Sequence, residues 1–158
     1  MALFSVAELL QMAVKDEETG IAFYKALAEV ARNSNVKDKC LAISKQEEGH
    51  ARRFREMVQE VGEFKTAEEY AGQYESYVRA LLDSRAFPEP EQAAERARQS
   101  ASDKEAIDIA MRLERDTLLF LQEMKNFVPS THTGYVDEII DEERGHLSDL
   151  TMLMESIN

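Results

Sequence analysis

Apolar residues recur at intervals of three and four along four long segments of the chain, the spacing that places side chains on one face of an α-helix. These segments cover about residues 5–31, 36–61, 102–128 and 134–156. Ser5 followed by Glu8 is a capping-box start for the first segment. Asn33-Ser34-Asn35 interrupts the pattern after it, and Gly62 ends the second segment. No segment shows the alternation of a β-strand, so the pattern predicts an all-α protein.

The connections between these helices differ greatly in length. Short connections join the first helix to the second and the third to the fourth, so each pair is expected to be antiparallel neighbours. About residues 62–101 join the second helix to the third, a length that can cross a bundle from end to end. This crossover contains a predicted helix over residues 67–82, and a shorter helix over about 91–99 is compatible with the pattern. We therefore predict a single domain, residues 1–158, folded as a four-helix bundle with one long crossover.

Composition narrows the functional classes. The chain has 158 residues and a formal net charge of −12, which disfavours binding to the phosphates of nucleic acid. No apolar run approaches the length of a membrane span, and no basic residue precedes Lys15, so neither a membrane helix nor a signal peptide is expected. Cys40 is the single cysteine, which excludes a disulfide framework and indicates a reducing compartment. A cytoplasmic location is the prediction.

Charged residues interrupt all four apolar stripes near the middle of each helix. Two of the stripes carry a Glu-x-x-His motif, and the two motifs use two of the three histidines in the chain. Residues three apart on a helix lie on the same face, so each motif directs a carboxylate and an imidazole the same way. In chain order the interrupting residues are Glu17, Glu47, His50, Glu114, Glu143 and His146.

The two halves of the chain also repeat. Lys45 to His50 aligns with Asp141 to His146, and Ala13 to Glu17 aligns with residues 110–114 at nearly the same offset. The same helical hairpin therefore occurs twice. A pair of hairpins related by a twofold axis is the arrangement that a symmetric site for two metal ions requires.

Charge balance favours two metal ions over one. Each buried carboxylate without a partner costs several kcal/mol. Four glutamates carry a charge of −4 and two neutral histidines carry none, so two divalent cations bring the total to zero. We expect Glu47 and Glu143 to bridge the ions. The resulting ligand sets are Glu17 with His50 for one ion, and Glu114 with His146 for the other.

The donor set and its surroundings refine this prediction. A site rich in carboxylates with two imidazoles suits iron or manganese, so two iron ions are expected, with manganese or a mixed pair as alternatives. Glu18, Glu48 and Glu142 are expected on the solvent side. Tyr24 is expected to be a packed core aromatic, the alternative being a hydrogen bond to a ligand or a redox role.

The chain resembles the rubrerythrin branch of the ferritin-like di-iron carboxylate superfamily along nearly its whole length. The resemblance implies a ferritin-like fold, reduction of peroxide or oxidation of ferrous iron with O₂, and a homodimer. Besides the six candidate ligands, it rests on the run Glu17-Glu18-x-Gly20-Ile21-x-Phe23-Tyr24 and on Ile139-Ile140-Asp141-Glu142-Glu143.

Two departures from that family bear on the mechanism. Classical members carry a rubredoxin domain with paired cysteines, which a chain with only Cys40 lacks, so a separate electron-donor protein is expected. Those proteins also have a further glutamate three residues after the ligand on the third helix, where this chain has Thr117. That difference argues against a metal-shifting peroxidase cycle that uses the additional carboxylate.

Three functions follow as hypotheses. The first is a non-haem di-iron oxidoreductase that reacts with hydrogen peroxide or O₂, with peroxide, O₂ or ferrous iron as its small substrates. The second is a non-catalytic protein that binds and handles iron. The third is a helical interaction protein whose metal site is only structural.

Overall fold

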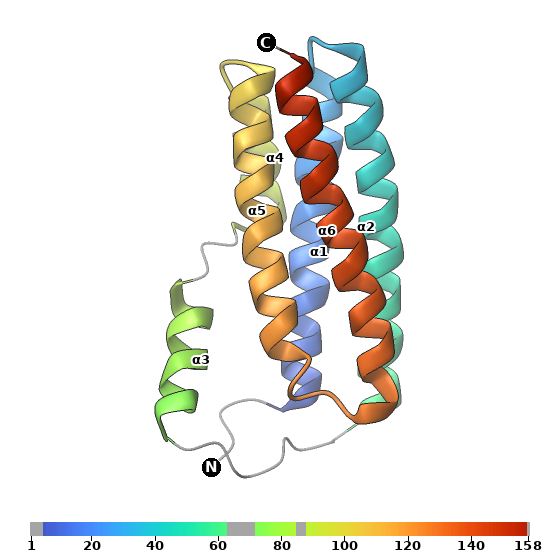
Figure 1. Ribbon diagram of the computed structural model, residues 1–158, viewed down its shortest axis with the longest axis vertical. Coiled ribbons are helices and arrows are strands. Elements are labelled where there is room, and N and C mark those ends of the chain that lie inside the picture. The colour runs from blue at the N-terminus through green and yellow to red at the C-terminus, as the bar shows by residue number, and fades with distance from the viewer. Residues whose placement is uncertain (1–4, 63–71, 85–87, 158) are drawn as a thin grey trace.

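The computed structural model describes residues 5–62, 72–84 and 88–157. Within these ranges every regular element is an α-helix, as predicted, and none of the helices combines the length and apolar character needed to cross a membrane. The elements are α1 (Val6–Val30), α2 (Ser34–Val61), α3 (Gly72–Ser84), α4 (Pro90–Arg98), α5 (Asp103–Met124) and α6 (Ser130–Ser156) (Figure 1).

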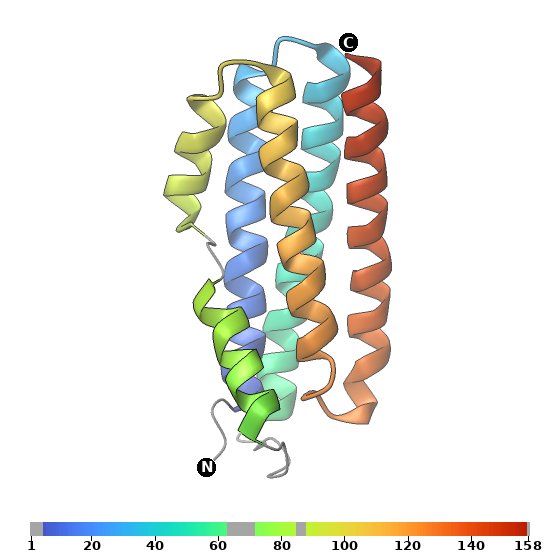
Figure 2. The ribbon, with the colours of Figure 1, turned by 60° about the vertical axis from the view of Figure 1, so that its left-hand side comes forward.

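The four long helices α1, α2, α5 and α6 lie side by side along the length of the molecule and form the bundle (Figures 1 and 2). The crossover from α2 to α5 carries α3 and α4; α4 packs against α1, and α3 contacts α5. The predicted bundle with one long crossover is therefore confirmed. Residues 67–71, the start of the predicted crossover helix, lie outside the described residues.

Side-chain caps define the starts of two bundle helices where the sequence predicted them. Ser5 accepts a hydrogen bond from the backbone N–H of Glu8, and the Glu8 carboxylate accepts one from the backbone N–H of Ser5 at 2.7 Å. Ser102 accepts in the same way from the backbone N–H of Glu105 at 3.2 Å. These bonds satisfy amide groups that have no partner inside the first turn of a helix.

The predicted starts of the other two bundle helices were too late. α2 begins at Ser34 instead of Val36, because the Asn33 side chain caps the helix by accepting from the backbone N–H of Asn35 at 2.8 Å. α6 begins at Ser130, directly after Pro129. The proline has a fixed φ near that of a helix and lacks an N–H, which the beginning of a helix does not need.

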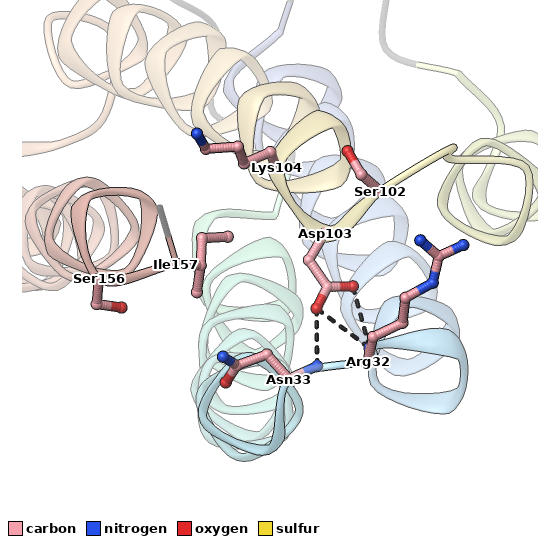
Figure 3. A pocket seen from close by; sticks show the side chains of 7 residues that line it. All are labelled: Arg32, Asn33, Ser102, Asp103, Lys104, Ser156 and Ile157. Carbon is pink, nitrogen blue, oxygen red and sulfur yellow. Dashed lines mark hydrogen bonds between the residues drawn. The ribbon is translucent and has the colours of Figure 1, made fainter.

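Asp103 connects the two helical hairpins at one end of the bundle. Its carboxylate accepts hydrogen bonds from the backbone N–H groups of Arg32, at 3.1 Å, and Asn33, at 2.8 Å (Figure 3). These contacts lie beside an open pocket of about 510 Å³ that is also lined by Lys104 and Ile157. The connection between α1 and α2 is thereby fixed to the start of α5.

The core consists of two apolar clusters separated by a polar layer, and each long helix passes through all three. One cluster contains Phe23 of α1, Ile43 of α2, Ile107 of α5 and Leu150 of α6. The other contains Leu10, Phe54, Phe120 and Ile139 from the same four helices. Between them, at mid-helix, each bundle helix places one or two titratable side chains. The fold thus concentrates buried charge in one layer of an otherwise apolar interior.

Candidate metal centre

All six candidate ligands converge in the polar layer. None of their side chains is more than slightly accessible, the largest residue exposures being 4% for Glu47 and His50. They come from four helices: Glu17 from α1, Glu47 and His50 from α2, Glu114 from α5, and Glu143 and His146 from α6. Titratable groups are seldom buried so completely unless they are paired or bind a metal.

The six residues form two overlapping groups of four. Within each group, one potential ligand atom from every residue lies within 4.8 Å of the others. Glu47 and Glu143 belong to both groups, the position expected of bridging carboxylates. The first group is completed by Glu17 and His50, and the second by Glu114 and His146. The structure therefore brings together the residues in the two sets that the sequence predicted.

Both histidines direct the same ring nitrogen toward the glutamates. Nδ1 of His50 lies 2.8 Å from Oε1 of Glu143 and 3.5 Å from Oε2 of Glu17. Nδ1 of His146 lies 3.0 Å from Oε1 of Glu47 and 3.0 Å from Oε2 of Glu143. Nδ1 is thus the nitrogen that each ring offers to the interior of the cluster.

The outward nitrogen of each histidine has as its partner the residue directly before the opposite motif. Nε2 of His50 lies 2.8 Å from Oε2 of Glu142, and Nε2 of His146 lies 3.1 Å from Oε1 of Gln46. Glu142 was expected to be only a solvent-side neighbour. Its side chain is indeed 51% exposed, but it also holds a buried ring. Because the contact joins α2 to α6, helical spacing within one segment could not indicate it.

Tyr24 is attached directly to the cluster. Its ring is 1% exposed and meets Phe23 edge to face, so the expectation of a packed core aromatic is correct. Its hydroxyl also donates a hydrogen bond to Oε1 of Glu114, so the alternative prediction of a hydrogen bond to a ligand is correct as well. A buried tyrosine hydroxyl normally requires a hydrogen-bond partner. Because Tyr24 lies on the same face of α1 as Glu17, the glutamate cluster provides that partner.

A small cavity and a close helix contact flank the glutamates. A Cβ atom on Gly20 would lie 2.9 Å from Oε2 of Glu47, so glycine permits this approach of α1 to α2. The adjoining cavity, of about 10 Å³, is lined by polar groups that include Asp16, Thr19 and Thr117. Asp16 and Thr19 were not among the predicted site residues, although both are buried polar residues close to Glu17 in α1.

Burial and mutual repulsion favour the neutral forms of three glutamates. Burial raises the pKa of Glu17 and Glu47 well above the usual value, and the charge of Glu143 adds to the effect on Glu17. Burial, followed by the charge of Glu143, raises the pKa of Glu114 to about 8. Carboxylates this close together cannot all be ionised without cations nearby.

The pKa values of Glu143 and of the two histidines shift so as to favour the charged forms of these groups. Burial alone would raise the pKa of Glu143, but the hydrogen bond from His146 and the adjacent imidazole of His50 outweigh it and the pKa falls. Burial alone would lower the pKa of His50, yet the adjacent carboxylate of Glu143 raises it to about 9. The pKa of His146 is also raised, by Glu114, Glu143 and Glu47, against the effect of burial. In the absence of metal, protons bound to these glutamates and histidines would therefore balance the charge that metal cations would otherwise balance.

The cluster fits a pair of metal ions. Several of its buried polar atoms have no hydrogen-bond partner, although such atoms are almost always paired in proteins. The 2.8 Å approach of His50 Nδ1 to Glu143 Oε1 lacks hydrogen-bond geometry, so both atoms belong to this set. The others are both carboxylate oxygens of Glu17 and Oε1 of Glu47. Four carboxylates and two imidazoles are also a donor set suited to iron or manganese.

Comparisons with known proteins agree with this geometry. The chain is similar in fold to the crystal structure of a candidate ferritin-like diiron-carboxylate protein from Thermotoga maritima, with a TM-score of 0.73 and 27% sequence identity over 100% of this chain and 99% of that one. A search of curated proteins found no match. The family model described as Rubrerythrin matches residues 8–154, a range that includes all six clustered residues. With its ferritin-like helical bundle and its buried Glu/His cluster, this chain belongs to the rubrerythrin family.

Proposed function

We propose that this chain is a non-haem di-iron carboxylate oxidoreductase that reduces hydrogen peroxide or uses O₂ to oxidise ferrous iron. The observation that carries the proposal is the pair of four-residue groups that share Glu47 and Glu143. Two bound iron ions would supply the electrons that the oxidant accepts. The ligands proposed for them are Glu17, Glu47, His50, Glu114, Glu143 and His146; manganese or a mixed pair also suits this donor set.

The two terminal glutamates are suited to different tasks. Neither carboxylate oxygen of Glu17 has a hydrogen-bond partner, so this side chain can rotate without breaking a hydrogen bond to the protein. Glu114 is held by the Tyr24 hydroxyl. A carboxylate that can change its orientation accommodates a change of charge at the centre, whereas a fixed one preserves the geometry. We assign the first role to Glu17 and the second to Glu114.

The adjoining cavity supports a small oxidant as the substrate. About 10 Å³ is room for roughly one water-sized molecule, which would admit peroxide or O₂ with little adjustment but would exclude an organic substrate. Tyr24, Thr117 and Glu114 line this space. The hydroxyl groups of Tyr24 and Thr117 can hydrogen-bond to an oxidant there.

Electrons for repeated turnover would come from a separate donor protein. Cys40, the single cysteine of the chain, is buried, so the chain has no set of cysteines to hold an electron-transfer iron. The proposed function therefore includes a separate protein that donates electrons to the metal centre. A protein that must be re-reduced from outside should complete one reaction with peroxide and then stop until a reductant is added.

The proposal is tested with metal-free protein that is loaded anaerobically with two equivalents of ferrous iron. One equivalent of hydrogen peroxide should be consumed while ferric absorption develops, and the Glu47→Gln/Glu143→Gln double variant should lose both responses. Binding of two irons with peroxide and O₂ both left unchanged would refute the proposal and favour a structural metal site. Uptake of far more than two irons per chain would favour iron storage instead.

A further inference from the structure

The two halves of the cluster differ in what supports each histidine. Glu142, directly before Glu143, contacts Nε2 of His50 at 2.8 Å. Gln46, directly before Glu47, contacts Nε2 of His146 at 3.1 Å. These two positions correspond in the internal repeat of the sequence. The repeat therefore places a carboxylate behind one histidine and a neutral amide behind the other.

This difference affects how well each ring can bind a metal. A carboxylate only accepts hydrogen bonds, so Glu142 keeps the proton of a neutral His50 on Nε2 and leaves the Nδ1 lone pair facing the cluster. The negative charge also strengthens the bond and makes the imidazole a better electron donor. The amide of Gln46 can either accept or donate after a rotation, so it does not by itself fix the tautomer of His146.

A second difference, on other helices, concerns the terminal glutamate of each half. In the His146 half, Tyr24 donates a hydrogen bond to Glu114, which withdraws electron density from that carboxylate. In the His50 half, both oxygens of Glu17 are buried and lack a partner. The position that corresponds to Tyr24 in the repeat is Leu121, which has no hydroxyl group. Of the two differences, the carboxylate behind His50 is the one that favours the Glu17 and His50 half, because the hydrogen bond from Tyr24 also holds Glu114 in place.

We propose that the two metal positions are unequal: a divalent metal ion binds first and more tightly at the Glu17–His50 position, and Glu142 is the positioning residue responsible. This inference rests on the di-iron function proposed above. Loss of the hydrogen-bond partner of a metal-binding histidine typically lowers metal affinity about 10- to 100-fold, which sets the expected difference between the positions. The weaker Glu114–His146 position would then be the one that exchanges its ion.

Titration of the metal-free protein with Co²⁺, followed by calorimetry and by the visible absorption of the bound ion, tests the proposal. The unsubstituted protein should show two steps that differ about 10- to 100-fold in affinity. Glu142→Gln should weaken the tight step, and Gln46→Glu should strengthen the weak one. Glu48→Gln is the matched control, because that side chain is 44% exposed and pairs with Lys25 instead of a histidine. It should change neither step.

Two further variants assign each step to its position. Glu17→Gln should remove the tight step, and Glu114→Gln should remove the weak one. Glu142 and Gln46 are exposed, so their variants should fold, which circular dichroism verifies. Equal steps, a tight step unaffected by Glu142→Gln, or loss of the weak step in Glu17→Gln would overturn the inference. If ferrous protein still consumed peroxide in that case, the proposed function would stand; if the protein bound no Co²⁺, both would fail.

Discussion

The imidazole rings of His50 and His146 stack inside the bundle with their centroids 5.8 Å apart and their planes at 28°. Each ring belongs to a different helical hairpin, so this contact marks the place where the two repeats of the chain meet. The glutamate of each motif reaches the histidine of the other, since Glu143 lies 2.8 Å from His50 and Glu47 lies 3.0 Å from His146. Metal ions at this layer would therefore join the two hairpins as well as support chemistry.

Removal of a shared carboxylate should affect both metal positions, whereas removal of a terminal one should affect a single position. We expect Glu143→Gln to retain well under one iron per chain and Glu17→Gln to retain about one, because Glu143 belongs to both groups of four and Glu17 to one. Metal content after dialysis measures this. Retention of two irons by Glu143→Gln would contradict the proposed ligand assignment.

Replacement of Gly20 by alanine should weaken metal binding, whereas the same replacement at a helical glycine remote from the cluster should not. In Gly20→Ala the new Cβ would lie 2.9 Å from Oε2 of Glu47, so that carboxylate must move and metal binding should weaken. The matched control is Gly145→Ala, also within a helix but with no atom within 4 Å of its added Cβ. The control should stabilise the protein by up to about 1 kcal/mol and bind metal normally. Equal metal affinity in the two variants would contradict the expectation.

The Tyr24 hydroxyl should contribute measurably to the stability of the metal-free protein. Tyr24→Phe leaves Oε1 of buried Glu114 without this donor, which should lower the free energy of unfolding by about 1–3 kcal/mol. Tyr77→Phe is the control, because Tyr77 is 42% exposed and its hydroxyl bonds to Glu123 at the surface. Tyr77→Phe should lower the free energy of unfolding by no more than about 0.5 kcal/mol. Urea denaturation compares the two, and equal losses would argue against a special role for Tyr24.

The stability of the metal-free protein should fall as the pH rises through the neutral range. The pKa of His50 is raised from 6.5 to about 9 and that of Glu114 from 4.5 to about 8. Between pH 6.5 and 8 both groups bind more protons in the folded than in the unfolded state, so the free energy of unfolding decreases with pH. The contribution of His50 is lost completely only above about pH 9.

Denaturation of chelator-treated protein between pH 6 and 10 measures this dependence. Metal ions compete with protons for the same side chains, so the loaded protein should be more stable at high pH and should release protons when metal binds. Metal-free protein that became more stable between pH 6.5 and 8 would show that the cluster is not protonated in the way described.

The sequence by itself determined the four long helices and identified the six clustered titratable residues as buried, although it did not indicate that Asp16 is also buried. Helical periodicity is a local property, so Glu17, Glu47 and His50 could be assigned to inward faces from their distance to neighbouring apolar residues. The internal repeat then indicated that the second half provides the same donors. The two sets of four residues could be predicted for this reason before any contact between helices was known.

Only the tertiary structure decided what surrounds those donors. The contact of Glu142 with His50 and that of Tyr24 with Glu114 depend on the register and distance between different helices. The spacing of residues within one helix does not specify these quantities, because they result from how the apolar clusters pack above and below the polar layer. Local pattern thus identifies the donors, whereas the packing of side chains across the bundle sets the difference between the two halves.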